Sequence, residues 1–310
     1  MAKVLLTGAS GFVGSHVLPA LLDAGHHVVA LCRSEKSGAK VQSRVERGAE
    51  RLQLHVGDVE NVDSVASAAS GCDAIVHLVA IPRDWSGGRD LDRVNHLGTA
   101  HVVAAAKSAG VRRIVHLGAL GVEERDGLNY ASSKARGERV VRESGLDFTI
   151  IKPSLIWGER DGFFNIVAAL VRVPAPVVPV PGNGKSRFQP VWVGDVARAI
   201  VTVLADARAS VGRSYELGGP RYWTYAEITR EVARALNKRR LIVPMPVPLI
   251  RLVAGTSEAI RLPFPVATDQ LRQLALDNIG ALDAVERELG FVPVDMAGRL
   301  GYLRRKLSKQ

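Results

Sequence analysis

The sequence has 310 residues, 47% of them hydrophobic and 23% charged, which is typical of a chain that buries a substantial core. No apolar run reaches the roughly 20 residues of a membrane-spanning helix, and a strand pattern starts too early for a signal peptide. The two cysteines, Cys32 and Cys72, lack the spacing of metal ligands and indicate buried thiols in a reducing cytoplasm. The net charge of +10 divides unevenly, with 18 basic and 17 acidic residues in 1–150 but 23 basic and 14 acidic residues in 151–310. Nucleic-acid binding is not expected, because the chain has no basic stretch interleaved with aromatic residues.

The first half of the chain alternates short apolar runs with longer amphipathic stretches. Strands are predicted at 4–7, 28–32, 52–56, 74–78, 113–117 and 148–152, and helices near 13–24, 62–69, 90–109 and 130–143. The strand runs are nearly continuous in Val, Ile and Leu, as expected when helices cover both faces of a parallel sheet. Repeated units of this kind predict an α/β fold with a doubly wound parallel sheet.

The pattern changes after residue 152. A run rich in Pro and Gly at 173–185 excludes regular helix and central strand, and favours a substrate-side loop over a polyproline ligand. Beyond it we expect helices near 194–205, 224–237, 267–274 and 279–289, an extended segment at 214–217 and a second Pro-rich run at 243–249. The chain is therefore expected to form a core over 1–152 and, over 153–310, a smaller C-terminal lobe interleaved with the end of the sheet.

A glycine-rich turn, TGASGFVG at 7–14, joins the first predicted strand to the first helix. Its three glycines permit a tight turn, a close approach to a pyrophosphate and close helix–sheet packing, and the helix N-terminus attracts phosphate. This placement predicts a Rossmann dinucleotide site in the core over 1–152. The cofactor contacts assigned to the turn are Thr7, Gly8, Ser10, Gly11, Phe12, Val13 and Gly14.

The end of the second strand bears on which dinucleotide is bound. A NAD site normally has Asp or Glu here to bind the ribose 2′-hydroxyl, whereas this chain has Arg33, with Lys36 and Lys40 nearby. Arginine suits a 2′-phosphate, so NADP(H) is predicted in preference to NAD(H); the alternative is a surface arginine at a strand end. Asp58, after the third strand, is a candidate for binding adenine or for capping the next helix.

These residues resemble an extended, or atypical, short-chain dehydrogenase/reductase of the group often described as NAD-dependent epimerases/dehydratases. Within that superfamily the sequence is most similar to relatives of the NADPH-binding accessory subunit of respiratory complex I. The similarity covers nearly the whole chain. It includes the turn at 7–14, GDV at 57–59, HLVA at 77–80, the segment 94–121, YASSK at 130–134, the segments 152–165 and 181–200, and YELGGP at 215–220.

The resemblance implies a catalytic group. Tyr130 would be the general acid/base, and Lys134, one helical turn on, would lower the pKa of the phenol and hold the nicotinamide ribose. Asn95 would orient a water or a backbone carbonyl behind the lysine. Further cofactor contacts implied in this way are Asp58, Val59, Val79, Ala80, Tyr130, Lys134 and Pro153.

The sequence departs from the family at the end of the fifth strand, where a catalytic Ser or Thr belongs. Gly118 and Ala119 stand there instead, and neither can donate a hydrogen bond to a substrate oxygen. Losing one such donor typically lowers the rate by ~10²–10³. The alternatives are that Tyr130 donates alone or that Ser132 or Ser133 substitutes for the missing hydroxyl. The GxSxG pattern of an α/β-hydrolase is absent.

Other charged and titratable residues give weaker signals. Asp195 is as readily a helix cap as a substrate contact. Residues 221–261 hold eight bases and three acids, and 296–310 hold five bases and no acid. Such a surface suits peripheral attachment to a membrane or protein complex, or else its apolar side packs on the core. The histidines suggest no metal site, and His77 and His116, at strand ends, are expected to be packed there.

Two functions follow from these patterns. The first is an NADP(H)-dependent oxidoreductase or epimerase/isomerase that acts on a small carbonyl or alcohol, anionic or lipid-like in view of the basic second half. The second is a non-catalytic NADPH-binding accessory or sensor protein that docks on a membrane complex or protein partner. The expected location is the cytoplasm, with the inner membrane face as a peripheral site.

Overall fold

The computed structural model describes residues 1–84, 86–246, 274 and 276–305. Its centre is a seven-stranded parallel sheet in the order β11-β6-β5-β4-β1-β2-β3. The strands are β1 (Lys3–Thr7), β2 (His27–Cys32), β3 (Leu52–Val56), β4 (Ala74–His77), β5 (Arg113–Leu117), β6 (Asp147–Pro153) and β11 (Arg213–Leu217). The strand order reverses beside β1, and ligands of such sheets bind at the carboxyl ends of the strands flanking that point.

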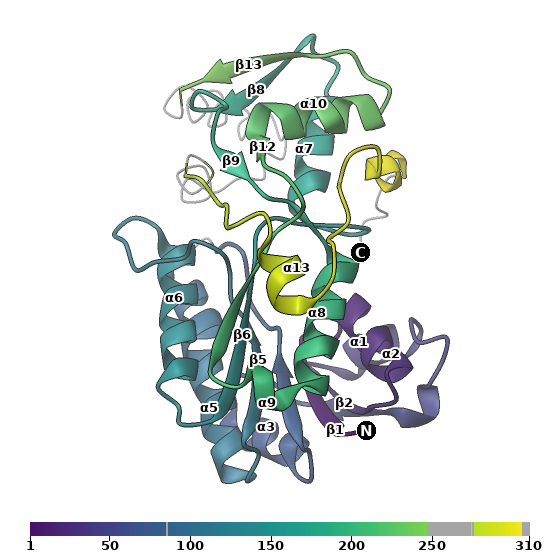
Figure 1. Ribbon diagram of the computed structural model, residues 1–310, viewed down its shortest axis with the longest axis vertical. Coiled ribbons are helices and arrows are strands. Elements are labelled where there is room, and N and C mark those ends of the chain that lie inside the picture. Colours follow the sequence, from purple (N-terminus) through teal and green to yellow (C-terminus); the bar gives the residue numbers. More distant parts are fainter. Residues whose placement is uncertain (85, 247–273, 275, 306–310) are drawn as a thin grey trace.

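Helices cover both faces of the sheet (Figure 1). On one face lie α3 (Val62–Ala69), α5 (Gly98–Ser108) and α6 (Asn129–Arg142); on the other lie α1 (Gly14–Asp23) and α8 (Val193–Ala205). Successive residues of β1 serve the two layers, since Leu5 packs with the α3 and α5 side and Leu6 with the α1 and α8 side. The predicted doubly wound α/β fold is confirmed.

The first half follows the predicted order of elements with three differences. The helix expected at 90–109 is divided into α4 (Arg89–Leu91), a π-helical turn η2 (Asp92–Leu97) and α5. A helix that was not predicted, α2 (Glu35–Gln42), follows β2, and the Ser34 side chain caps it by accepting from the Ser37 N–H. A short 3-10 turn, η1 (Ala49–Arg51), precedes β3.

The second half completes the sheet with β11 and adds a separate group of elements beyond the carboxyl ends of the strands (Figure 1). Three two-stranded sheets belong to this group. They pair β7 (Ile156–Trp157) with β10 (Val191–Trp192), β9 (Arg187–Phe188) with β12 (Trp223–Thr224), and β8 (Val177–Pro181) with β13 (Leu241–Met245). The remaining elements of the second half are α7 (Phe163–Arg172), α9 (Ala207–Ser210), α10 (Tyr225–Ala235), α13 (Ala284–Leu289) and η3 (Leu300–Arg304).

Two expectations for the second half are wrong. The segment expected to be a loop at 173–185 contains β8, which pairs with β13 in a sheet of two strands within the described residues. Its prolines are tolerated there, because such a strand can lack an N–H on its open edge. The helix expected at 279–289 begins only at Ala284, because a turn at 282–283 precedes it and the Gly280 N–H donates to Gln189 Oε1 at 2.9 Å. Of the helix expected at 267–274, only Leu274 is among the described residues. Of the second Pro-rich run at 243–249, residues 243–246 are described and the rest lie outside the described residues.

Both cysteines are buried free thiols, as predicted. Burial raises the pKa of each of them, which keeps them protonated. Among the residues that the structure describes, no helix is long and apolar enough to cross a membrane.

Candidate active site

The phosphate loop connects β1 to α1 at the centre of the sheet. Gly8 has a φ of +81°, in the left-handed region, and its carbonyl accepts the Gly11 N–H at 3.0 Å. A Cβ on Gly14 would lie 2.1 Å from the Gly8 carbonyl oxygen, so only glycine lets α1 begin this close to β1. Gly11 is exposed and Ser10, Phe12 and Val13 are half-buried, leaving a backbone cradle that fits a dinucleotide phosphate. The residues present therefore fit the predicted ligand.

The Thr7 side chain packs against the end of β4 rather than facing the loop. Its side chain is fully buried, with Oγ1 2.7 Å from His77 Nδ1, and the same oxygen accepts the Leu78 N–H at 3.3 Å. The hydroxyl thus joins β1 to the end of β4.

The residues predicted around the adenosine end follow β2 and β3. Arg33 is exposed directly after β2. Asp58 Oδ1 accepts the Glu60 N–H at 3.1 Å, whereas the cap of α3 is Asn61, whose Oδ1 accepts the Ser64 N–H at 3.0 Å. The alternative role of Asp58 as a helix cap is therefore wrong, because Asn61 directly precedes α3.

The other predicted cofactor residues lie at the carboxyl ends of three strands. Val59, shortly after β3, is buried against Gly98 at the start of α5. Val79 and Ala80 follow β4, the first half-buried and the second exposed, and Pro153 is the last residue of β6. The fold thus gathers these residues along the edge of the sheet that carries the phosphate loop.

Tyr130 and Lys134 lie one turn apart on α6. The Lys134 side chain is buried and Nζ donates to the Leu117 carbonyl at 2.5 Å. Burial lowers the pKa of Lys134 to about 8, with the charge of Glu138 opposing the shift. Burial, and then the charge of Glu138, raises the pKa of Tyr130 to about 12. The expected lowering of the Tyr130 pKa by Lys134 is therefore wrong for this structure, because burial of the phenol dominates.

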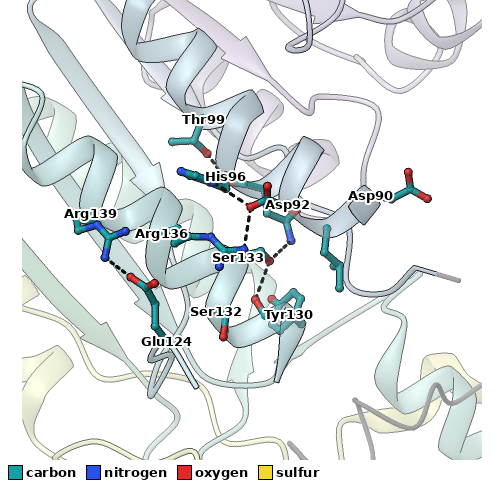
Figure 2. A network of polar contacts seen from close by, with 12 residues as sticks. Asp90, Asp92, His96, Thr99, Glu124, Tyr130, Ser132, Ser133, Arg136 and Arg139 are labelled. Atoms are coloured by element: carbon teal, nitrogen blue, oxygen red, sulfur yellow. Dashed lines mark hydrogen bonds and ion pairs between the residues drawn. The ribbon is translucent and has the colours of Figure 1, made fainter. Parts of the chain in front are cut away.

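Asn95 belongs to the π-helical turn η2 and joins two segments that carry site residues. Its Nδ2 donates to the Ile81 carbonyl at 3.0 Å and to Ser133 Oγ at 3.1 Å, while Oδ1 accepts the Ile81 N–H at 2.8 Å. Ser133 Oγ donates in turn to the Tyr130 carbonyl at 2.9 Å (Figure 2). The Asn95 side chain thus fixes the loop after β4 to α6. Turns of the π-helical kind often occur at functional sites.

A second connection between η2 and α6 lies beside the first. Asp92 Oδ1 is 2.9 Å from His96 Nδ1 and accepts from Arg136 Nη2 at 2.8 Å (Figure 2). Burial alone would raise the pKa of Asp92, but these hydrogen bonds and charges hold it below its usual value. The carboxylate therefore stays charged and helps to hold α6 in place.

Two histidines close the site behind Lys134. His77 and His116 are buried and stacked, with ring centroids 5.3 Å apart, as packing at strand ends predicts. Burial, and then the charge of Lys134, lowers the pKa of His77 to about 3 and that of His116 well below its usual value. Neutral imidazoles therefore form the wall behind the lysine.

Glu138 is a site residue that the sequence reading missed. It is buried on α6, Oε1 accepts the Ala119 N–H at 3.2 Å, and Oε2 lies 3.3 Å from Lys152 Nζ. A Cβ on Gly118 would lie 2.3 Å from Glu138 Oε1, so the carboxylate requires glycine there. Its spacing of four residues from Lys134 and eight from Tyr130 on one helix face was the available signal.

A cavity of about 300 Å³ opens beside α6 and the end of β6. Its lining is mostly apolar and includes Ala119 but not Gly118. The alternative donors are engaged elsewhere: Ser132 Oγ donates to the Arg125 carbonyl and Ser133 Oγ to that of Tyr130. The lining includes Ala119, Tyr130, Pro153, Phe163, Phe188 and Asn278.

Asp195 takes neither of its expected roles. It lies in the first turn of α8, whose N-cap is Trp192, and its Oδ2 accepts the Val294 N–H at 2.7 Å. The carboxylate is buried and connects α8 to a segment near the C-terminus. Within the described part of the chain, no cluster of three or more His, Cys, Asp or Glu side chains could hold a metal ion.

Comparisons with known proteins agree with this geometry. The family described as NAD(P)H-binding matches residues 8–207. The chain is 26% identical over 301 residues to the mitochondrial NADH dehydrogenase (ubiquinone) 1 alpha subcomplex subunit 9 of Arabidopsis thaliana, covering 94% of this chain and 74% of the relative. It is 24% identical to the 2-alkyl-3-oxoalkanoate reductase of Stenotrophomonas maltophilia, with 94% of each chain covered.

A similar fold is found among solved structures. The NADPH-dependent quinone oxidoreductase of Escherichia coli, complexed with NADPH, matches with a TM-score of 0.75 at 18% identity, covering 97% of this chain and 100% of that chain. The family match spans more than half of this chain and includes residues 8–14 of the phosphate loop and the residues of α6. The chain therefore belongs to the NAD(P)H-binding family, and it shares the fold of that quinone oxidoreductase.

Proposed function

We propose that the protein is an NADP(H)-dependent oxidoreductase that reduces a carbonyl group on an apolar substrate. The observation that carries this proposal is the cavity of about 300 Å³, in which Tyr130 stands among apolar and aromatic side chains. Arg83 also lines the cavity and would suit a substrate with a carboxylate. Relatives named as a 2-alkyl-3-oxoalkanoate reductase and a quinone oxidoreductase support the same substrate class.

The roles of the site residues are part of this proposal. A bound nicotinamide would supply the hydride. The phosphate loop would hold the pyrophosphate, Arg33 a 2′-phosphate, and the ends of β3, β4 and β6 the rest of the cofactor. We further assign cofactor binding to the core over 1–152 and substrate or partner binding to 153–310.

Tyr130 would donate the proton that the reduced carbonyl oxygen takes up. Because the pKa of Tyr130 is raised to about 12, its hydroxyl is protonated at neutral pH and ready to donate. The nearby ammonium of Lys134 would stabilise the phenolate left behind, and Asn95 would keep α6 in position through Ser133. Compared with the catalytic group of the family that the sequence resembles, this site would lack one hydroxyl, at the position of Ala119.

The test is NADPH oxidation with quinones, alkyl 3-oxo acids and apolar ketones. We expect turnover of at least one of these, and we expect Tyr130→Phe to lower kcat by roughly 10²-fold or more while the Kd for NADPH stays unchanged. Tight NADPH binding without turnover of any compound in the three classes would overturn the proposed reductase activity.

A second candidate function is a non-catalytic NADPH-binding accessory protein docked on a membrane complex or a protein partner at the inner membrane face. It is favoured by Ala119 in place of the family hydroxyl and by the relative named as an alpha subcomplex subunit of NADH dehydrogenase. In that case NADPH raises the Tm, and Tyr130→Phe leaves co-purification with the partner intact. Failure to retain any partner from solubilised membranes would count against it.

A further inference from the structure

Two arginines from distant segments meet at the phosphate loop. Arg44, just after α2, donates from Nη1 to the Ser10 carbonyl at 3.2 Å. Arg160, between β7 and α7, donates from Nη2 to Ser15 Oγ at 2.8 Å, in the first turn of α1. Ser15 Oγ donates in turn to the Phe12 carbonyl at 2.7 Å. The loop is therefore flanked by one guanidinium from each half of the chain.

These cations are close enough to repel one another. Burial, and then the charge of Arg160, lowers the pKa of Arg44, and burial followed by the charges of both arginines lowers that of Lys40. No ion pair joins Arg44 or Arg160 to a carboxylate within the described residues, and the neighbouring Glu159 pairs instead with Arg305 at 3.8 Å. A cluster of like charges of this kind favours a bound anion.

The backbone holds Arg160 in this position. Its φ is +72°, which is uncommon for a residue with a side chain. The next residue, Asp161, is buried and accepts the N–H groups of Phe164 at 2.8 Å and Asn165 at 3.2 Å, which fixes the turn to the start of α7. Gly162 and Phe163, which follow directly, line the apolar cavity. The same turn therefore serves the phosphate loop and the cavity wall.

We propose that Arg44, Lys40 and Arg160 form a clamp that binds a phosphate group of the dinucleotide. The inference rests on the proposed placement of the cofactor over the phosphate loop. Arg160 closes the clamp from the second half of the chain, so that a bound phosphate also holds the turn that carries Phe163. The group bound is a phosphate, and it is either the 2′-phosphate of NADPH or the pyrophosphate common to NADPH and NADH.

The test measures the Kd by calorimetry for NADPH, NADH, 2′,5′-ADP and ADP-ribose. Arg44→Gln and Arg160→Gln are each expected to weaken binding roughly 10- to 100-fold, as for loss of one charge-assisted hydrogen bond to phosphate, and Arg160→Lys to restore most of it. A loss confined to NADPH and 2′,5′-ADP assigns the clamp to the 2′-phosphate. An equal loss for NADPH, NADH and ADP-ribose assigns it to the pyrophosphate.

Arg208→Gln, at an exposed position on α9, is the matched control for removing one positive charge. Unchanged affinity for all four ligands in both clamp variants, or an equal loss in the control, overturns the proposal. Thermal unfolding without ligand verifies that the variants fold. If NADPH binds tightly and the clamp variants lose this affinity while no carbonyl is reduced, the proposed reductase activity is wrong and the phosphate clamp is supported. If the enzyme reduces a carbonyl and the clamp variants bind all four ligands normally, the activity is supported and the clamp is wrong.

Discussion

Gly118 and Ala119 follow one another at the end of β5 but meet different surroundings. Gly118 lies against the carboxylate of Glu138, whereas Ala119 lines the apolar cavity together with Tyr130. The Ala119 backbone N–H also donates to Glu138 Oε1 at 3.2 Å, which fixes the direction of the Ala119 side chain. A hydroxyl added at Ala119 would therefore enter the cavity that contains the Tyr130 phenol.

Ala119→Ser is predicted to increase turnover. A second donor beside Tyr130 would stabilise the developing oxyanion, and the rate should rise by roughly tenfold or more, less than the ~10²–10³ measured for preorganised donors. The measurement is kcat/KM with the best carbonyl substrate. An active enzyme whose kcat/KM is unchanged by the serine would show that Ala119 does not face the reacting oxygen.

Gly118→Ser is the matched variant one residue earlier. Its Cβ would come within 2.3 Å of Glu138 Oε1, so the buried carboxylate must move away from Lys152 and the Ala119 N–H. We expect a lower free energy of unfolding, by about 1–3 kcal/mol, and no increase in turnover. Equal effects of the two serines would contradict the different environments described here.

The site residues could be predicted in part. Motif spacing placed Tyr130 and Lys134 on one face of a helix, and the structure confirms that placement, although their roles stay predictions. The rest depended on neighbours that are distant in sequence. The pKa of Tyr130 is set by burial and by Glu138, and the Asn95 side chain is fixed by Ile81 and Ser133, which no local pattern reveals.

Among the elements, β5 carries a buried histidine with little hydrogen bonding. Neither ring nitrogen of His116 bonds to a described protein atom, and the ring stacks on His77 at 5.3 Å. Its pKa is lowered by burial and by Lys134, so below about pH 6.5 the unfolded chain binds a proton that the folded chain does not. Stability is therefore lost as the pH falls below this value.

His116→Phe is predicted to stabilise the protein, and more so in acid. The phenyl ring keeps the stack without polar nitrogens, and it removes a penalty that grows by about 1.4 kcal/mol for each pH unit below the unfolded pKa. The free energy of unfolding, from urea titrations at about pH 5 and about pH 8, should rise more at the lower pH. A gain of equal size at both would show that His116 does not resist protonation in the folded state.

The elements themselves were predictable where one signal dominated. Continuous apolar runs identified the first six strands of the parallel sheet, because strands buried on both faces need such runs. The helix at 90–109 was predicted unbroken because its periodicity does not reveal the π-helical turn that places Asn95. The strand β8 was missed because its prolines exclude a central strand. In the part of the chain that the structure describes, β13 is its one partner, so the other edge tolerates the prolines.

At the scale of the whole molecule, the cavity is closed by segments far apart in sequence. Asn278 joins three of them: its backbone N–H donates to the Arg187 carbonyl at 2.8 Å, its Nδ2 donates to the Leu120 carbonyl at 2.6 Å, and its Oδ1 accepts from Ser154 Oγ at 2.5 Å. It thus connects β9, the loop after β5 and the end of β6 around one side of the proposed substrate site.

Asn278→Ala is predicted to lower the free energy of unfolding by about 1–3 kcal/mol, because Ser154 Oγ and the Leu120 carbonyl lose their side-chain partner. The KM of the carbonyl substrate should rise, since the cavity wall loosens, while the Kd for NADPH is unchanged. Arg112→Ala is the control, because it removes an exposed ion pair with Asp147 that lies away from the cavity and is worth about 0–1 kcal/mol. Equal effects of the two variants on stability and KM would show that Asn278 does not hold the cavity together.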